Sequence, residues 1–235
     1  MKFSAPLVHG TLKRRYKRFL ADVILADGTE VTAHCANPGS MLSCSEPGAP
    51  VLLSEATNPA RKLKYTWELI HVNGTWVCVN TQRTNALVEE ALRAGVITEV
   101  FSSDMQLRRE VPYGGSRVDF LLENGAGRIF LEVKNVTLAQ DGRAMFPDAV
   151  TKRGQKHLQE LMQVVEAGDR AVIFFLVSRE DTRVFSPACH IDPDYARLLA
   201  QAVECGVELL VYEARVGPEE ILVTGRMPWE LDGEK

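Results

Sequence analysis

Three residues of the chain have the types and the spacing of a metal-dependent phosphodiesterase site. They are Asp119, Glu132 and Lys134. Carboxylate oxygens are the ligands that hard divalent cations prefer, and a strand carbonyl, here that of Val133, can add another. Such a cation polarises a phosphate and lowers the pKa of a bound water. An ammonium group such as that of Lys134 can orient the water or offset charge in the transition state. The sequence therefore predicts Asp119, Glu132 and Lys134 as catalytic residues, Asp119, Glu132 and Val133 as metal ligands, and Mg²⁺ or Mn²⁺ as the cofactor.

A hairpin is expected to bring the two acids together. Two strand-like apolar runs flank the turn-forming segment 124–127 (NGAG). If the turn centres on the two middle residues, the numbers of cross-strand partners add up to 251 and Asp119 lies opposite Glu132. A loop one residue longer or shorter would shift this register. Because side chains alternate along a strand, Glu132 and Lys134 point to the same face.

A surface salt bridge is the plainer interpretation of Glu132 and Lys134, since such pairs are common and stabilise little. The surrounding run, RIFLEV, is strongly apolar and indicates a central strand of a sheet. Charged groups are costly to bury there without a function. The sequence therefore favours an active site over a surface pair.

Two groups of polar residues are candidates for contact with nucleic acid. The run from Lys13 to Phe19 interleaves basic and aromatic residues, which suits a strand that contacts phosphates and stacks bases. The second group opens a helix near residue 150. Cations are unfavourable at that end of a helix unless a phosphate docks there, and His157 is expected on the helix surface. A solvated basic face is the alternative for both groups. The residues predicted to bind nucleic acid are Arg14, Arg15, Lys17, Arg18, Lys152, Arg153 and Gln155.

The charge of the chain is unevenly distributed. Its 235 residues have a net charge of −4, but residues 1–85 contain ten Lys and Arg against six Asp and Glu, and the remainder is acidic. A basic binding module joined to a carboxylate-bearing one would have this pattern, and so would a chance distribution.

Targeting and redox signals are lacking in the sequence. The longest apolar run, Ala171 to Val177, is too short to cross a bilayer, and the N-terminus does not resemble a signal peptide. The five cysteines are odd in number and form no CxxC pair, which fits reduced thiols. We expect a cytoplasmic protein with no membrane partner. A homo-oligomer is possible, but the sequence gives no sign of one.

The first eighty residues alternate short strand-like runs with turns. Strands are expected at 19–25, 31–35, 51–54, 66–72 and 75–80, with hairpin signals at Asp27-Gly28 and Asn73-Gly74. Several short strands with little helix indicate a small barrel, of the OB type first and the SH3-like type second.

Strands and helices mix after residue 85. Asn85 is expected to cap a helix over 86–93, and further helices are expected at about 150–167 and 194–205. Strands are expected at 106–111, 117–122, 128–136, 171–177, 207–212 and 220–223. This pattern predicts an α/β domain with a mixed sheet, and the boundary between the two domains near residues 81–86.

Longer motifs resemble known families. The order Asp119, then Glu132-Val133-Lys134, resembles the PD-(D/E)XK nuclease superfamily, although Val118 stands where that pattern has proline. The segments HCANPGS (34–40), YGGSRVDFLL (113–122), LEVKNVTL (131–138), FPDAVTKRGQKHLQEL (146–161) and IDP (191–193) together resemble the sugar fermentation stimulation protein A family over nearly the whole chain.

This resemblance implies an α/β fold class with a small N-terminal OB-like β-barrel (1–83) followed by a restriction-endonuclease-like mixed-sheet α/β domain (84–235). It also implies DNA binding and a link to sugar-utilisation genes in bacteria. We expect a DNA-binding protein with a metal-dependent nuclease-type active site, with RNA as the alternative substrate. A non-cleaving DNA-binding regulator on a nuclease-like scaffold is the second hypothesis, although no helix-turn-helix signature appears. An RNA-processing role through the OB-like domain is the third.

Overall fold

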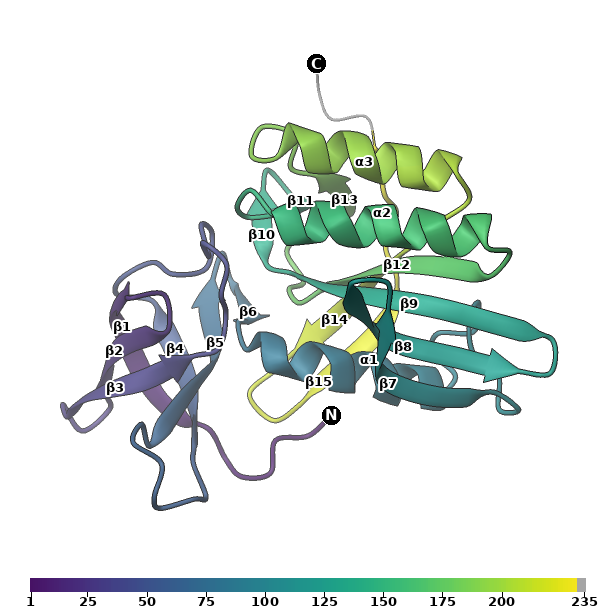
Figure 1. Cartoon of the computed structure of the whole chain (residues 1–235). Helices are drawn as coiled ribbons and strands as arrows, with labels where there is room; N and C mark the ends of the chain where they lie inside the picture. Colours follow the sequence, from purple (N-terminus) through teal and green to yellow (C-terminus); the bar gives the residue numbers. More distant parts are fainter. Residues whose placement is uncertain (232–235) are drawn as a thin grey trace.

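The N-terminal strands close into a barrel in the computed structural model, which describes residues 1–231. The strands are β1 (Val8–Tyr16), β2 (Leu20–Leu25), β3 (Glu30–Cys35), β4 (Pro50–Glu55), β5 (Tyr65–Val72) and β6 (Thr75–Cys78). β1 pairs with both β2 and β4, and a parallel pairing of β3 with β5 closes the circle. The inward residues, among them Leu12, Val23 and Trp67, are fully buried. This closed five-strand circle, extended by β6, confirms the OB-like barrel (Figure 1).

The second domain has a six-stranded mixed sheet in the order β15-β14-β12-β9-β8-β7. Its strands are β7 (Gln106–Tyr113), β8 (Ser116–Asn124), β9 (Gly127–Val136), β12 (Arg170–Val177), β14 (Glu208–Val216) and β15 (Ile221–Arg226). β9, β12 and β14 are parallel to one another. Helix α1 (Thr84–Arg93) packs on one face, while α2 (Lys152–Glu166) and α3 (Pro193–Glu204) pack on the other (Figure 1). The expected mixed-sheet α/β domain is confirmed.

Both faces of the sheet are covered, and this explains the apolar sequence of its central strands. In β12 every residue after Arg170 is buried. In β9, Leu131 and Val133 pack toward α1, and Phe130 and Val136 pack toward α2. Glu132 and Lys134 therefore lie on one of the two central strands of the sheet, on its α2 side.

Four strands were not predicted. β1 carries three consecutive cations, Lys13, Arg14 and Arg15, of which the first two are exposed, so its apolar signal is weak. β10 (Leu138–Gln140), β11 (Arg143–Phe146) and β13 (Val184–Pro187) form a separate three-stranded sheet. These strands have only three or four residues each, too few for an alternating pattern to stand out.

The two domains are held together by polar contacts. The backbone N–H of Met41 donates to Asp148 Oδ2 at 2.8 Å. The hydroxyl of Ser43 donates to the carbonyl of Thr137 at 3.1 Å and accepts from fully buried Arg179 at 3.1 Å. Residues 1–3 were assigned to the first domain, but they lie against the second, where Lys2 forms a β-bridge with Glu220. Among residues 1–231, no helix combines the length and the hydropathy that a membrane span needs.

Candidate active site

The hairpin of β8 and β9 has the predicted register. The paired residues run from Asn124–Gly127 back to Phe120–Leu131, and their numbers add up to 251. The ladder ends there, so Asp119 is not paired with Glu132 through the backbone. Instead, Asp119 Oδ2 accepts a hydrogen bond from the backbone N–H of Val133 at 2.7 Å. Its Oδ1 accepts one from Asn85 Nδ2 on α1 at 2.8 Å. The Asp119 carboxylate thus occupies the point where the two strands separate.

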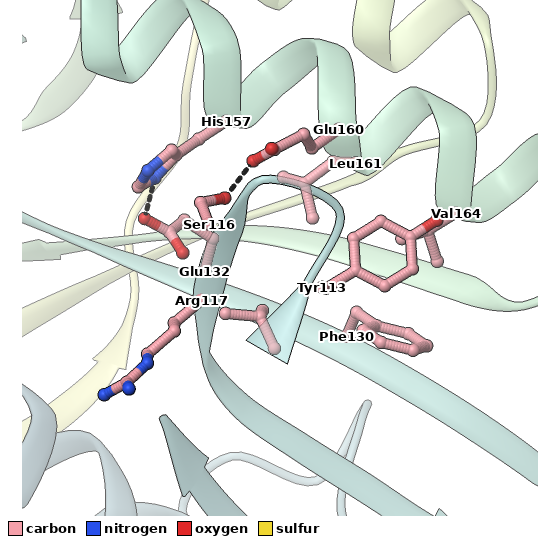
Figure 2. Close-up of a pocket in the computed structure, with 10 residues that line it drawn as sticks. Tyr113, Ser116, Arg117, Phe130, Glu132, His157, Glu160, Leu161 and Val164 are labelled. Carbon is pink, nitrogen blue, oxygen red and sulfur yellow. Dashed lines mark hydrogen bonds and ion pairs between the residues drawn. The ribbon is translucent and has the colours of Figure 1, made fainter. Parts of the chain in front are cut away.

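Glu132 lies on β9, next to Val133, and is only 5% exposed. Its Oε1 accepts from Lys134 Nζ at 2.6 Å and contacts Nδ1 of His157 on α2. Figure 2 shows the imidazole of His157 directly over this carboxylate. Lys134 Nζ also lies 3.2 Å from the same ring nitrogen. Glu132 and Lys134 therefore form a largely buried pair and not a surface salt bridge.

The two acids have opposite pKa shifts. Burial and the nearby charge of Glu132 raise the pKa of Asp119 to about 6, against the opposing effects of Val133, Asn85 and Lys134. Burial would also raise the pKa of Glu132, but His157 and Lys134 outweigh it and hold that pKa below its usual value. Both groups are predominantly ionised at neutral pH, and each disfavours the charge of the other.

These two carboxylates fit a hard cation and not a soft one. Among residues 1–231 there is no cluster of three or more His, Cys, Asp and Glu side chains that could hold a metal ion. The ligand set would therefore consist of Asp119, Glu132, the predicted carbonyl of Val133 and water. The repulsion between the two carboxylates is the observation that favours a cation here, because a positive ion between them would relieve it.

The site forms the floor of a groove between the two domains. The groove has a volume of about 980 Å³. Asp119, Glu132 and Lys134 line its floor, and Arg18 of the barrel and Arg153 of α2 line its sides. The predicted catalytic residues are thus in contact with a space that a ligand can enter.

The structure separates the predicted basic run of the barrel into residues with different surroundings. Arg14 is ion-paired with Asp22 at 2.8 Å and lies over the Tyr16 ring. Arg15 donates to the backbone carbonyls of residues 37, 39 and 40. Lys17 and Arg18 form the turn between β1 and β2, with positive φ angles of 47° and 66°. Of these four, only Arg18 lines the groove.

The predicted residues at the start of α2 are divided in the same way. Arg153 lines the groove, and its Nε lies 3.3 Å from His157 Nε2. Lys152 is exposed and lies 3.6 Å from Asp194. Gln155 is buried and donates to Asp192 Oδ1 at 2.8 Å. Neither Lys152 nor Gln155 is among the residues that line the groove.

Comparisons with known proteins decide the family. The model for the sugar fermentation stimulation protein RE domain matches residues 82–220, and that for the SfsA N-terminal OB domain matches residues 14–79. The chain belongs to the sugar fermentation stimulation protein family. A homologue from Geobacter metallireducens is 57% identical over 97% of this chain and 99% of its own length. One from Geobacter sulfurreducens is 58% identical over 95% of this chain and 96% of its own length.

A solved structure supports the same assignment. It is described as SfsA of Pyrococcus furiosus in complex with Ca²⁺. It is 28% identical to this chain, covers 98% of both chains and superimposes with a TM-score of 0.89. This member of the sugar fermentation stimulation protein family therefore has the fold of that relative over 98% of the chain.

Two residues of the site were placed wrongly by the sequence. His157 was expected on the helix surface, but it is buried at 5% exposure against Glu132. Asn85 was expected to cap α1, but Arg83 occupies the cap and Asn85 bonds Asp119 from the first turn. A signal was present in both cases. His157 precedes Leu161 by four positions, and Asn85 precedes Val88 by three, which places each on the buried face of its helix.

A small cavity lies behind the Glu132–His157 pair. Its volume is about 20 Å³, which is room for a single water. Figure 2 shows Tyr113, Phe130 and Val164 on its apolar side and the Ser116–Glu160 hydrogen bond at its upper edge. That bond ties the β7–β8 turn to α2. The cavity is too small for a nucleotide, so the groove is the only one of these two spaces that suits a substrate.

Proposed function

We propose that this protein is a metal-dependent nuclease that acts on DNA in the groove between its two domains. The observation that carries the proposal is the convergence of Asp119, Glu132 and Lys134 on the groove floor. A protein that only binds DNA has no need for two carboxylates facing a polyanion. A catalytic site does need them, since they can hold a cation against the scissile phosphate.

The cofactor we propose is Mg²⁺ or Mn²⁺, held by Asp119, Glu132 and the carbonyl of Val133. A bound divalent cation would polarise the phosphate and lower the pKa of an attacking water. The description of the Pyrococcus furiosus relative as a Ca²⁺ complex supports this choice. Ca²⁺ is, like Mg²⁺, a hard cation that takes oxygen ligands.

The side chains around the acids have separate tasks. Asn85 and the N–H of Val133 orient the Asp119 carboxylate by two hydrogen bonds. His157 fixes Glu132 from above. Lys134 stands within 2.6 Å of Glu132 at the groove floor. From there its ammonium group can stabilise negative charge that develops on the phosphate.

A non-cleaving DNA-binding regulator remains the second candidate. The observation in its favour is that Lys134 and His157 already neutralise Glu132, and that the described residues offer only two carboxylates to a cation. A regulator of this kind would bind DNA in the same groove and would leave it intact.

A cleavage assay separates the two candidates. Labelled single- and double-stranded DNA and RNA are incubated with the protein in Mn²⁺, Mg²⁺ or EDTA, beside an Asp119→Asn variant of near-identical shape. We expect DNA cleavage that requires the cation and is lost in the variant. Binding without cleavage of any substrate in either cation would refute the nuclease and favour the regulator.

A further inference from the structure

We propose that the groove accepts an unpaired DNA strand and excludes the intact duplex. This inference rests on the proposed function for the site at the groove floor, and adds the class of substrate.

The groove is too small for a duplex. Its volume of about 980 Å³ is at the upper end of the ~300–1,000 Å³ of pockets that enclose small molecules. A few nucleotides of one strand are of that size. A duplex brings a second, base-paired strand along with the first, and a volume of this size leaves no room for it. The carboxylates lie at the floor of this space, so a strand must enter it to reach them.

The width of the groove is fixed by the contacts between the domains. The loop that follows β3 reaches across to the second domain, where Met41 and Gly39 meet the Asp148 carboxylate. Arg15 holds this loop by three backbone carbonyls. Beyond it, Ser43 bonds both Thr137 and Ala139. Opening the groove for a duplex would break these hydrogen bonds together.

The charge of the groove is insufficient for a duplex. Four cations line it, namely Arg18, Arg109, Lys134 and Arg153, and so do four acids, namely Glu110, Asp119, Glu132 and Asp148. Arg109 is ion-paired with Glu89, and Lys134 with Glu132. Two rim arginines remain for phosphates, whereas duplex-binding proteins commonly make about 6–10 phosphate contacts.

Apolar side chains at the groove (Val150) and directly beside it (Phe19, next to the lining residue Arg18) can contact an unpaired base. Phe19 follows Arg18 at the β1–β2 turn and is 45% exposed. Val150 lines the groove on the opposite domain and is 62% exposed. Bases of a single strand are free to stack on an aromatic side chain such as Phe19 and to contact an apolar one such as Val150. In a duplex the same base faces are already stacked on one another.

The test is fluorescence anisotropy with the unmodified chain in EDTA, so that binding is measured without cleavage. The probes are a labelled DNA strand of about 20 nucleotides, longer than the ~4–16 nucleotides that an OB fold covers, the matching duplex and the matching RNA strand. The variants are Arg18→Glu and Phe19→Ala. Arg197→Glu is the charge-matched control, since Arg197 on α3 is exposed and does not line the groove.

We expect the DNA strand to bind at least about tenfold more tightly than the duplex. Arg18→Glu and Phe19→Ala should each weaken that binding at least about fivefold, in line with one lost phosphate or stacking contact, and Arg197→Glu should not. Equal or tighter binding of the duplex, tighter binding of RNA, or no binding of the strand would overturn the inference. Strand-selective binding without any cleavage would support it and refute only the nuclease. Efficient cleavage of a blunt duplex in the cleavage assay with Mg²⁺ or Mn²⁺ would support the nuclease and overturn this inference.

Discussion

Glu132 is the side chain on which the site depends most. It is buried in a central strand, where a carboxylate is stable only with partners, and it has two of them, Lys134 and His157. Asp119 is held separately, by Asn85 and the backbone of Val133. Each acid is therefore fixed in place by the protein before any cation binds.

His157 offers a test of this positioning. An asparagine amide can replace the Nδ1 contact with Glu132, and a glutamine amide can replace only the Nε2 contact with Arg153. We expect His157→Asn to keep DNA cleavage within about tenfold of the unmodified chain, or about 1.4 kcal/mol of activation free energy. His157→Gln and His157→Ala should lose more cleavage activity, through a lower kcat at an unchanged KM. Steady-state kinetics on a DNA strand measures this, and equal losses in all three variants would show that His157 does not act through Glu132.

The types and spacing of the two acids and the lysine were readable from the sequence, but their partners were not. Asp119, Glu132 and Lys134 are linked by strand alternation and hairpin register, which are local rules. His157 and Asn85 reach the site from helices distant in sequence. Helical periodicity places both on the side of the helix that faces the sheet, but only the packing of α1 and α2 on the sheet shows what they touch.

The strands of the barrel place one further acid in a polar network. Asp22 on β2 is buried and accepts hydrogen bonds from Arg14 and Tyr16 of β1 and Thr32 of β3. Burial alone would raise the pKa of Asp22, but these donors hold it below its usual value. The network links three neighbouring strands on the barrel face that bears the basic run.

Asp22→Asn should destabilise the protein at neutral pH and less so in acid. Because the pKa of Asp22 is lower in the folded chain than in the unfolded one, its ionised form stabilises the fold above the unfolded value of about 3.9. This stabilisation is lost as the pH falls through the folded value. In urea unfolding at pH 7, we expect the free energy of unfolding of the variant to be lower than that of the unmodified chain by roughly 1–2 kcal/mol. This difference should shrink below about pH 4. A difference that is constant with pH would contradict the assigned network.

The loop between the domains requires glycine at position 39. A Cβ there would overlap the Asp148 carboxylate, which also accepts from Met41 N–H. We expect Gly39→Ala to cost about 1–3 kcal/mol of stability, as an overpacked contact does. Gly125→Ala is the matched control, since no atom lies within 4 Å of its Cβ position. When Asp148 is also changed to alanine, Gly39→Ala should cost little stability, because the overlapping carboxylate is gone. If the loss of stability persisted in that double variant, the overlap with Asp148 would not be its cause.

The short elements show where sequence patterns lose their power. α2 was predicted to within two residues at its start because Leu158, Leu161 and Val165 mark one face over about two turns. β10, β11 and β13 were missed because strands of three or four residues cannot show alternation. β1 was missed as a regular barrel strand because its cations dominate, although it pairs with both β2 and β4.

The entire chain combines a net charge of −4 with a groove that has few unpaired cations. Its affinity for DNA should therefore depend only weakly on salt. With two rim arginines against the backbone of a single strand, the plot of log K against log salt should have a slope of about −1.4. Arg18→Glu should reduce the magnitude of that slope by about 0.7. Anisotropy titrations over a range of NaCl concentrations test this, and a slope steeper than about −5 would indicate a wider phosphate-binding surface.

The central claim is that Asp119 and Glu132 hold a divalent cation at the floor of the groove. Isothermal titration of Mn²⁺ into the unmodified chain and into Glu132→Ala tests it most directly, with circular dichroism to confirm that the variant is folded. We predict one binding site in the unmodified chain and no detectable binding in the folded variant. Binding of equal affinity and stoichiometry in both would contradict the assignment of this site as a metal centre.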